Sequence, residues 1–130
     1  MIEYKTNSPI SVEQFIELLN KTTLGARRPL DDEERVAAVL HHTDLLVTAW
    51  DGELLVGVAR SVTDFSYCCY LSDLAVDEQY QKQGIGLQLI EYTKQALHPQ
   101  AKIVLLSAPQ AVDYYPHIGF TQHMSAWTKS

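Results

Sequence analysis

The spacing of apolar and polar residues changes several times along the chain, and each change marks an expected element. The opening run "IEYKT" predicts a short first strand. Apolar residues at helical spacing follow it, with Ser11 and Gln14 placed as a capping box at the start of a helix. Gly25 is placed to end that helix.

A second helix is expected after Asp31 or Asp32. Acidic residues occupy its first turn and the pair His41-His42 its last, which the helix dipole favours. The two histidines lack two further ligand residues at metal spacing, so they predict the end of a helix and no metal site.

Two apolar runs joined by Asp51-Gly52, within residues 44–62, give the clearest local signal in the sequence. An Asp-Gly pair suits a tight type I′ turn, which predicts a β-hairpin. The run from Tyr67 to Val76 is rich in aromatic and β-favouring residues and extends the hairpin into an antiparallel meander.

The second half of the chain predicts one parallel crossover. A helix is expected from about Gly84 to Leu97, followed by the apolar run "AKIVLLSA", a strand expected to be covered on both faces and to lie parallel to the strand before the helix. A short helix from Pro109 to about Tyr115 and a last strand over residues 119–129 complete the pattern. The fold class expected is α+β (mixed α/β), in one domain covering residues 1–130.

Composition and net charge reduce the classes of partner expected for this chain. The chain has 130 residues and a formal charge of −6, which argues against nucleic acid and mildly favours a cationic substrate. Its first residues show neither a signal peptide nor an apolar run long enough to cross a bilayer, so a cytoplasmic protein without a membrane partner is expected. The adjacent Cys68 and Cys69 predict neither a disulfide framework nor zinc.

The segment "QKQGIG", Gln81 to Gly86, lies where a strand gives way to a helix. Free backbone N–H groups at the start of a helix form a natural site for a phosphate. A Walker A loop would end in Gly-Lys-Ser/Thr, which this segment does not. A dinucleotide fingerprint would need a third glycine where Leu89 stands. Nucleoside triphosphates and NAD are therefore not the expected ligands.

This Gln-x-x-Gly-x-Gly segment resembles the signature of the GCN5-related N-acetyltransferase (GNAT) superfamily. The later stretch "SAPQAVDYYPHIGF" is similar to a second motif of that family, with Tyr114, Tyr115 and Phe120 at matching positions. Ala108 stands where family members often carry Asn, so one contact to the cofactor is expected to be missing. The resemblance implies acetyl-CoA as co-substrate and no metal. It implies that Leu74, Ala75 and Val76 contact the pantetheine arm of the cofactor. The residues that it implies bind the diphosphate are Gln81, Lys82, Gln83, Gly84, Ile85, Gly86 and Leu87.

The same resemblance assigns catalytic roles. The Val76 N–H is expected to polarise the thioester carbonyl, and the Tyr115 hydroxyl to protonate the departing thiolate. Tyr114 is expected in the core. Asp73 is the first candidate for the base that accepts the amine proton, although strand alternation turns it to the face opposite Leu74, where pairing with a loop or a helix end is the alternative.

The function expected is transfer of an acetyl group from acetyl-CoA to a primary amine by direct attack in a ternary complex. Both cysteines lie in a strand away from the loop, which counts against a covalent intermediate. The acceptor is a small amine or polyamine, or a peptide amine. Arg27-Arg28 is either a grip for an anionic group of the acceptor or a solvated basic pair. The alternative function is a non-catalytic acyl-CoA sensor or an interaction module, and family analogy suggests a homodimer.

Overall fold

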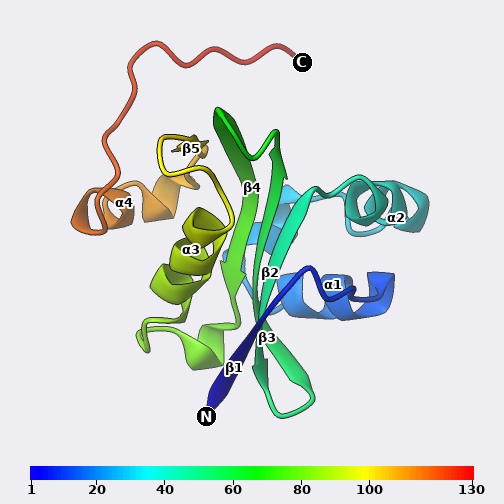
Figure 1. Cartoon of the computed structure of the whole chain (residues 1–130). Coiled ribbons are helices and arrows are strands. Elements are labelled where there is room, and N and C mark those ends of the chain that lie inside the picture. Colours follow the sequence, from blue (N-terminus) through cyan, green and yellow to red (C-terminus); the bar gives the residue numbers. More distant parts are fainter.

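The computed structural model describes residues 1–130, built around one five-stranded sheet in the order β1-β2-β3-β4-β5 (Figure 1). All neighbouring strands are antiparallel except β4 and β5, which run parallel. This mixed sheet confirms the predicted fold class. The strands are β1 (Ile2–Thr6), β2 (Leu45–Asp51), β3 (Leu54–Thr63), β4 (Cys68–Val76) and β5 (Lys102–Val104).

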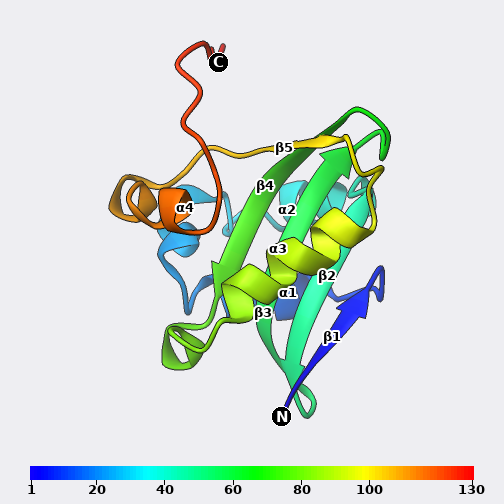
Figure 2. The same cartoon turned by 60° about the vertical axis from the view of Figure 1, so that its left-hand side comes forward.

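Helices cover both faces of the sheet (Figure 2). α1 (Val12–Leu19) and α2 (Glu33–His41) lie on one face, and α3 (Ile85–Gln95) crosses the other; α4 (Tyr114–His117) follows β5. Short 3₁₀ turns stand between these elements: η1 (Thr23–Arg27), η2 (Glu78–Tyr80) and η3 (Pro109–Ala111). None of the helices has both the length and the apolar character needed to cross a membrane.

Gly57 of β3 sets how closely α3 approaches the sheet. A Cβ at this position would lie 3.1 Å from Leu89 Cδ1 and 3.3 Å from Ile85 Cγ2, both on α3. Leu89 and Ile85 are buried together with Val56 and Ala59 in the core between helix and sheet. Because interiors are close-packed, this glycine fixes α3 and the loop that precedes it.

The predicted hairpin is present, but its turn differs from the expected type. Asp51 pairs with Leu54, so Gly52 and Glu53 form the two-residue loop. Only Gly52 has a positive φ, of 61°. A type I′ turn requires positive φ at both central residues, whereas type II′ requires it only at the first. The observed pattern is that of type II′.

The first helix begins as predicted but ends earlier. Ser11 and Gln14 form the capping box, whereas α1 ends at Leu19 and Gly25 falls within η1. The Thr22 hydroxyl donates to the Leu19 carbonyl and accepts from the Leu24 N–H, which turns the chain at the end of α1. Gly25 packs against that end, since a Cβ there would lie 2.6 Å from the Leu19 oxygen. The second helix begins at the predicted cap, Asp32.

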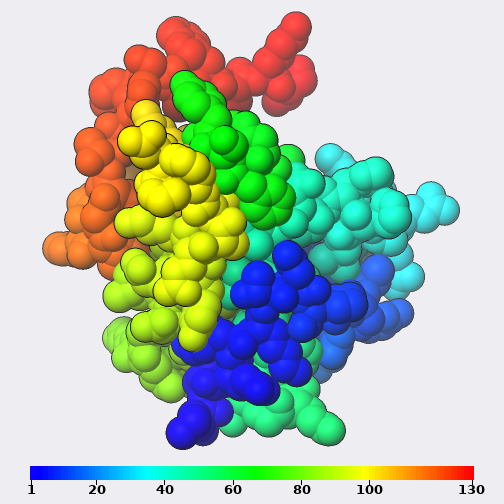
Figure 3. Space-filling model, in the orientation of Figure 1, coloured from blue at the N-terminus to red at the C-terminus, as the bar shows by residue number.

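The predictions for the last two strands are right only in part. β5 runs parallel to β4 as predicted, but it has only three residues, and Lys102 and Val104 are exposed, so it is not covered on both faces. Residues 119–129 form no strand, and the chain beyond Phe120 is exposed and projects from the body of the molecule (Figure 3). Met124 and Trp127 in this tail are 86% and 92% exposed. Apolar runs predict burial, but nothing in one copy of the chain covers these residues.

Candidate functional site

Strand β4 keeps its outer neighbour over only part of its length. β5 pairs with Cys68 to Tyr70 and then leaves the sheet, so the outer edge of β4 from Leu71 to Val76 has no strand beside it. Ser72 is the extra residue of a β-bulge, since Arg60 pairs with Asp73 and the next β3 residue pairs with Leu71. Bulges of this kind commonly stand next to active sites.

Main-chain groups of β4 point into this opening. Asp77 N–H donates to Val56 carbonyl, which makes these two residues a hydrogen-bonded pair of the antiparallel ladder. The pairs alternate, so the backbone groups of Val76 and Leu74 face away from β3, toward the opening. Those of Ala75 face β3, and its side chain lies in the α1 core. The geometry therefore supports Leu74 and Val76 as pantetheine contacts and leaves Ala75 without a free main-chain group there.

The loop after β4 is anchored at both sides. Asp77 is buried and caps η2 by accepting from Gln79 N–H, while the Tyr80 hydroxyl donates to Asp51 (2.6 Å). This bond to Asp51 raises the pKa of the Tyr80 phenol. These contacts hold the loop in place before α3.

Between Gln81 and Leu87 the backbone N–H groups donate to no protein acceptor; donation resumes with Gln88, which bonds to the Gly84 carbonyl. Lys82 and Gly84 both have left-handed backbones, with φ of 64° and 81°. Left-handed residues within such a turn make successive N–H groups converge into an anion-binding nest, here at the positive end of α3. This geometry is compatible with the anion site that the glycine motif predicts.

Tyr114 belongs to this loop region and not to the core, so its predicted burial is wrong. Its ring is 42% exposed. Its hydroxyl lies 3.4 Å from where a Cβ on Gly86 would be. The position before Tyr115 therefore puts a phenol over the first turn of α3, a feature that no local sequence pattern reveals.

Tyr115 lines a small cavity where β4 and β5 separate. Its walls come from β4 (Leu71, Ser72, Leu74), from the segment after β5 (Leu105, Leu106, Ala108, Ala111) and from the turn after α1 (Thr23, Leu24, Arg28). Burial, with a smaller effect of Tyr114, raises the pKa of the Tyr115 phenol above its ordinary value. Burial disfavours the charged phenolate, so Tyr115 keeps its proton at neutral pH.

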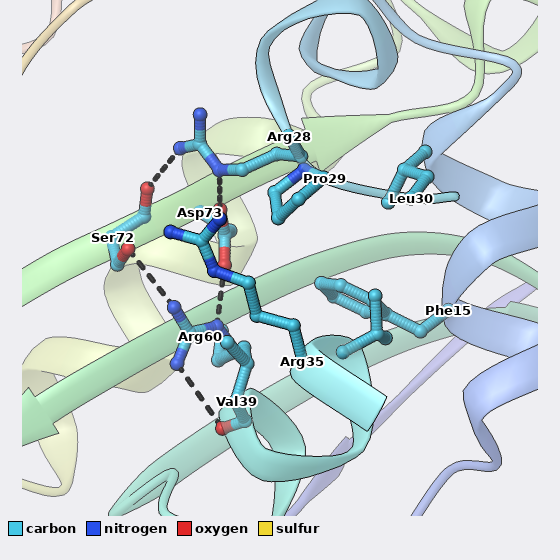
Figure 4. A pocket seen from close by; sticks show the side chains of 10 residues that line it. Phe15, Arg28, Pro29, Leu30, Arg35, Val39, Arg60, Ser72 and Asp73 are labelled. Carbon is cyan, nitrogen blue, oxygen red and sulfur yellow. Dashed lines mark hydrogen bonds and ion pairs between the residues drawn. The ribbon is translucent and has the colours of Figure 1, made fainter. Parts of the chain in front are cut away.

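Asp73 lies on the opposite face of β4, as strand alternation predicts, and is 1% exposed. One carboxylate oxygen accepts from Arg28 Nε (2.6 Å), and the other accepts from Arg60 Nε. The same two arginines also bond to Ser72, Arg28 to its carbonyl and Arg60 to its hydroxyl (Figure 4). Asp73 is thus enclosed by two cations.

Comparison with known proteins agrees with this geometry. Residues 11–129 match the family model described as "Acetyltransferase (GNAT) domain". The chain belongs to the GCN5-related N-acetyltransferase (GNAT) family. This confirms the resemblance based on the glycine loop and the tyrosine motif.

Among curated relatives, this GNAT chain is 37% identical over 68 residues to "GCN5-related N-acetyltransferase 2, chloroplastic" of Arabidopsis thaliana, covering 51% of the chain and 26% of the relative. The chain thus matches only about a quarter of that protein's length.

Among solved structures, a GNAT family protein, SP0256, from Streptococcus pneumoniae TIGR4 is 25% identical with a TM-score of 0.76, covering 99% of this chain and 98% of that chain. An aminoglycoside acetyltransferase from an uncultured soil metagenomic sample, solved with sisomicin, is 19% identical with a TM-score of 0.71, covering 99% and 94% of the two chains. The second likeness is one of fold alone.

The GNAT motifs did not reveal the residues that surround Asp73. Arg60 and Ser72 carry no motif, and Arg28 was one of two alternatives within a basic pair. Arg28 and Asp73 are 45 residues apart in sequence, so only the folded sheet brings them together.

We predict that Asp73→Asn lowers the free energy of unfolding of this GNAT domain by about 3–5 kcal/mol, because it leaves a buried guanidinium without its counter-charge. Urea unfolding measures this. Glu91→Gln is the matched control, since Glu91 is exposed and has no ion pair. A loss for Asp73→Asn no larger than that of the control would show that the arginines do not depend on this carboxylate.

Proposed function

We propose that residues 1–130 form one acetyl-CoA-dependent N-acetyltransferase domain that acetylates a primary amine by direct attack in a ternary complex. The observation that carries this proposal is the row of free N–H groups from Gln81 to Leu87, placed beside the unpaired edge of β4 and near the cavity of Tyr115. A cofactor with a diphosphate at one end and a thioester at the other matches these two features.

The residues present fit acetyl-CoA. The nest at the start of α3 suits a diphosphate, and the absence of a side chain at Gly86 leaves its backbone accessible. The outward-facing groups of Leu74 and Val76 suit the amides of the pantetheine arm. Gln81 Nε2 donates to the Val76 carbonyl at 3.3 Å, which marks that carbonyl as an available acceptor.

Each residue then has a defined task. Acetyl-CoA, when bound, supplies the acetyl group as a thioester. The loop amides hold the diphosphate, the Val76 N–H donates to the thioester carbonyl oxygen, and Tyr115 Oη donates its proton to the leaving sulfur.

The proton of the attacking amine needs another acceptor. The first candidate, Asp73, has both oxygens engaged by arginines, so protonating it would weaken two ion pairs. This geometry favours a positioning role for Asp73, which holds Arg28 and η1 against the sheet. We therefore propose that water in the cavity accepts the amine proton, and keep Asp73 as the alternative base.

The alternative of a non-catalytic acyl-CoA sensor shares the loop but gives Tyr115 no task. A sensor needs no proton donor at the sulfur end of the ligand.

A cytoplasmic location is also part of the proposal. One relative carries a chloroplastic name, so a measurement of the compartment tests this part.

The loop assignment predicts that Gly86→Leu weakens acetyl-CoA binding about tenfold or more, because the new side chain covers the amides while its helical backbone stays unstrained. Titration calorimetry with acetyl-CoA measures this. Gln88→Leu is the control, since it places the same side chain at an exposed site two residues further into α3. Equal affinities of the two variants would place the diphosphate elsewhere.

The acid assignment predicts that Tyr115→Phe lowers kcat by about 10²–10⁴-fold while acetyl-CoA affinity stays the same, because only proton donation is lost. Release of free thiol follows the reaction. In the parent protein the raised pKa of Tyr115 keeps the acid protonated, so any loss of kcat caused by its ionisation occurs above the ordinary phenol value of about 10. Tyr92→Phe is the control, because the Tyr92 ring on α3 stacks on Tyr4 and does not line the cavity. Undiminished kcat in Tyr115→Phe would remove it from this role.

We also propose a homodimer in which residues 119–130 of one copy lie along β5 of another. The outer edge of β5 is unpaired, Val104 and Leu106 beside it are 44% and 53% exposed, and the tail carries its own exposed apolar side chains. An unpaired edge and an apolar strand-like segment complement each other.

Trp127→Ser is expected to weaken the dimer about tenfold or more, since buried tryptophans often dominate interfaces. Sedimentation measures the dissociation constant. Leu54→Ser, in the hairpin turn at the other end of the sheet, is the control. A monomer at all concentrations, or a dimer unaffected by Trp127→Ser, would reject this interface.

A further inference from the structure

A second pocket lies on the α1–α2 face of the sheet and carries the opposite charge from the protein as a whole. Its volume is about 200 Å³. Three arginines line it (Arg28, Arg35 and Arg60) against one carboxylate, Asp73 (Figure 4). Three positive charges and one negative charge leave a local excess of two positive charges, within a chain of formal charge −6.

Arg35 is the arginine whose charge is not balanced. Arg28 and Arg60 are held by Asp73 and by Ser72. Arg35 comes from α2 and lines the same pocket as Asp73 and the other two arginines (Figure 4). Its guanidinium donates to no protein acceptor, and none of the ion pairs includes it; only its backbone N–H bonds, to Asp32.

The acidic residues of α2 do not neutralise it. Asp32 caps the helix, and Glu33 and Glu34 are exposed in the first turn without contact to the pocket. Arg35 is exposed and its five donors are unused, so its guanidinium is available to a planar anion that enters this pocket, such as a carboxylate.

The rest of the pocket is apolar. Apart from Ser72, the remaining lining residues are Phe15, Pro29, Leu30, Val36 and Val39. The volume is below the about 300–1,000 Å³ of sites for drug-sized ligands, so the pocket suits one compact group. Its lining therefore matches a carboxylate joined to a small apolar side chain.

This pocket adjoins the cavity of Tyr115. Arg28 and Ser72 line both, so they form the wall between the two. A small acceptor bound by its carboxylate at Arg35 would thus have its amine directed to the side of β4 where the thioester carbonyl is expected.

From these features we infer that the acceptor is an amino-acid-like amine, with a carboxylate bound by Arg35 and a small apolar side chain against Phe15 and Leu30. The inference rests on the proposed acetyltransferase function. It reverses the preference for a polyamine that the net charge alone gives, because an acceptor responds to the charge of its pocket and not to that of the whole chain.

A matched acceptor series tests the inference: leucine, leucinamide and 3-methylbutylamine, which differ at the carboxylate position, with phosphoethanolamine as an arm for a phosphate. Leucine is expected to have a kcat/KM at least about tenfold above the other three, the gain of one charge-assisted contact. Acetylation of leucinamide or 3-methylbutylamine at a kcat/KM equal to or above that of leucine would overturn the inference and leave the acetyltransferase standing. A preference for phosphoethanolamine would overturn the choice of a carboxylate.

Arg35→Gln is expected to lower kcat/KM for leucine about tenfold or more. The kcat/KM for leucinamide and the affinity for acetyl-CoA are expected to stay unchanged. Arg27→Gln is the matched control, because Arg27 is exposed and lines neither pocket. Equal effects of the two variants would overturn the assignment of Arg35.

A binding measurement separates this inference from the proposed function. N-acetyl-leucine is expected to raise the melting temperature of the parent protein. N-acetyl-leucinamide is expected to leave that melting temperature unchanged. The Arg35→Gln variant is expected to show no rise with N-acetyl-leucine. If the rise occurs although no amine is acetylated, the anion site stands and the acetyltransferase proposal fails. If N-acetyl-leucine has no effect on an active enzyme, the anion site fails alone.

Discussion

The separation of β5 from β4 is the constraint on which the rest of the site depends. After Tyr70 the outer edge of β4 loses its partner, which leaves the main-chain groups of Leu74 and Val76 facing an opening. A polar sheet edge is costly to bury without hydrogen bonds, so such an opening needs a ligand or water. The glycine loop continues directly from this edge and adds free N–H groups at the end of α3. One break in a ladder thus produces a continuous polar track from strand to helix.

Side chains of β4 point to both faces of the sheet and make different contacts on each face. Leu74 faces the side of α3 and Tyr115, where the donor is proposed to lie. Asp73 faces the side of α1 and α2, where it ties Arg28 and Arg60 to the sheet. The bulge at Ser72 changes the alternation just where the two sides meet, so that its carbonyl and hydroxyl also hold these arginines. The proposed donor and acceptor sites are therefore separated by a single strand, β4.

Features that depend on residues close together in the sequence could be predicted from the sequence. The Ser11–Gln14 capping box, the hairpin at Gly52 and the glycine loop each depend on residues within a few positions of one another. Distant contacts were not predictable in this way: the Arg28–Asp73 pair spans 45 residues, and the placement of Arg35 depends on how α2 packs on the sheet. The predicted last strand failed for a related reason, since strand propensity does not form a ladder without a neighbouring edge to pair with.

The docking of η1 onto the end of α1 depends on main-chain contact. Gly25 sits so close to the Leu19 carbonyl that no side chain fits between them, and the Thr22 hydroxyl closes the turn. The position of this segment is thus set by backbone and cap, while Thr23 lines the cavity without packing on the α1 core. A change of the Thr23 side chain can therefore alter the shape of the cavity while the fold of the turn stays the same.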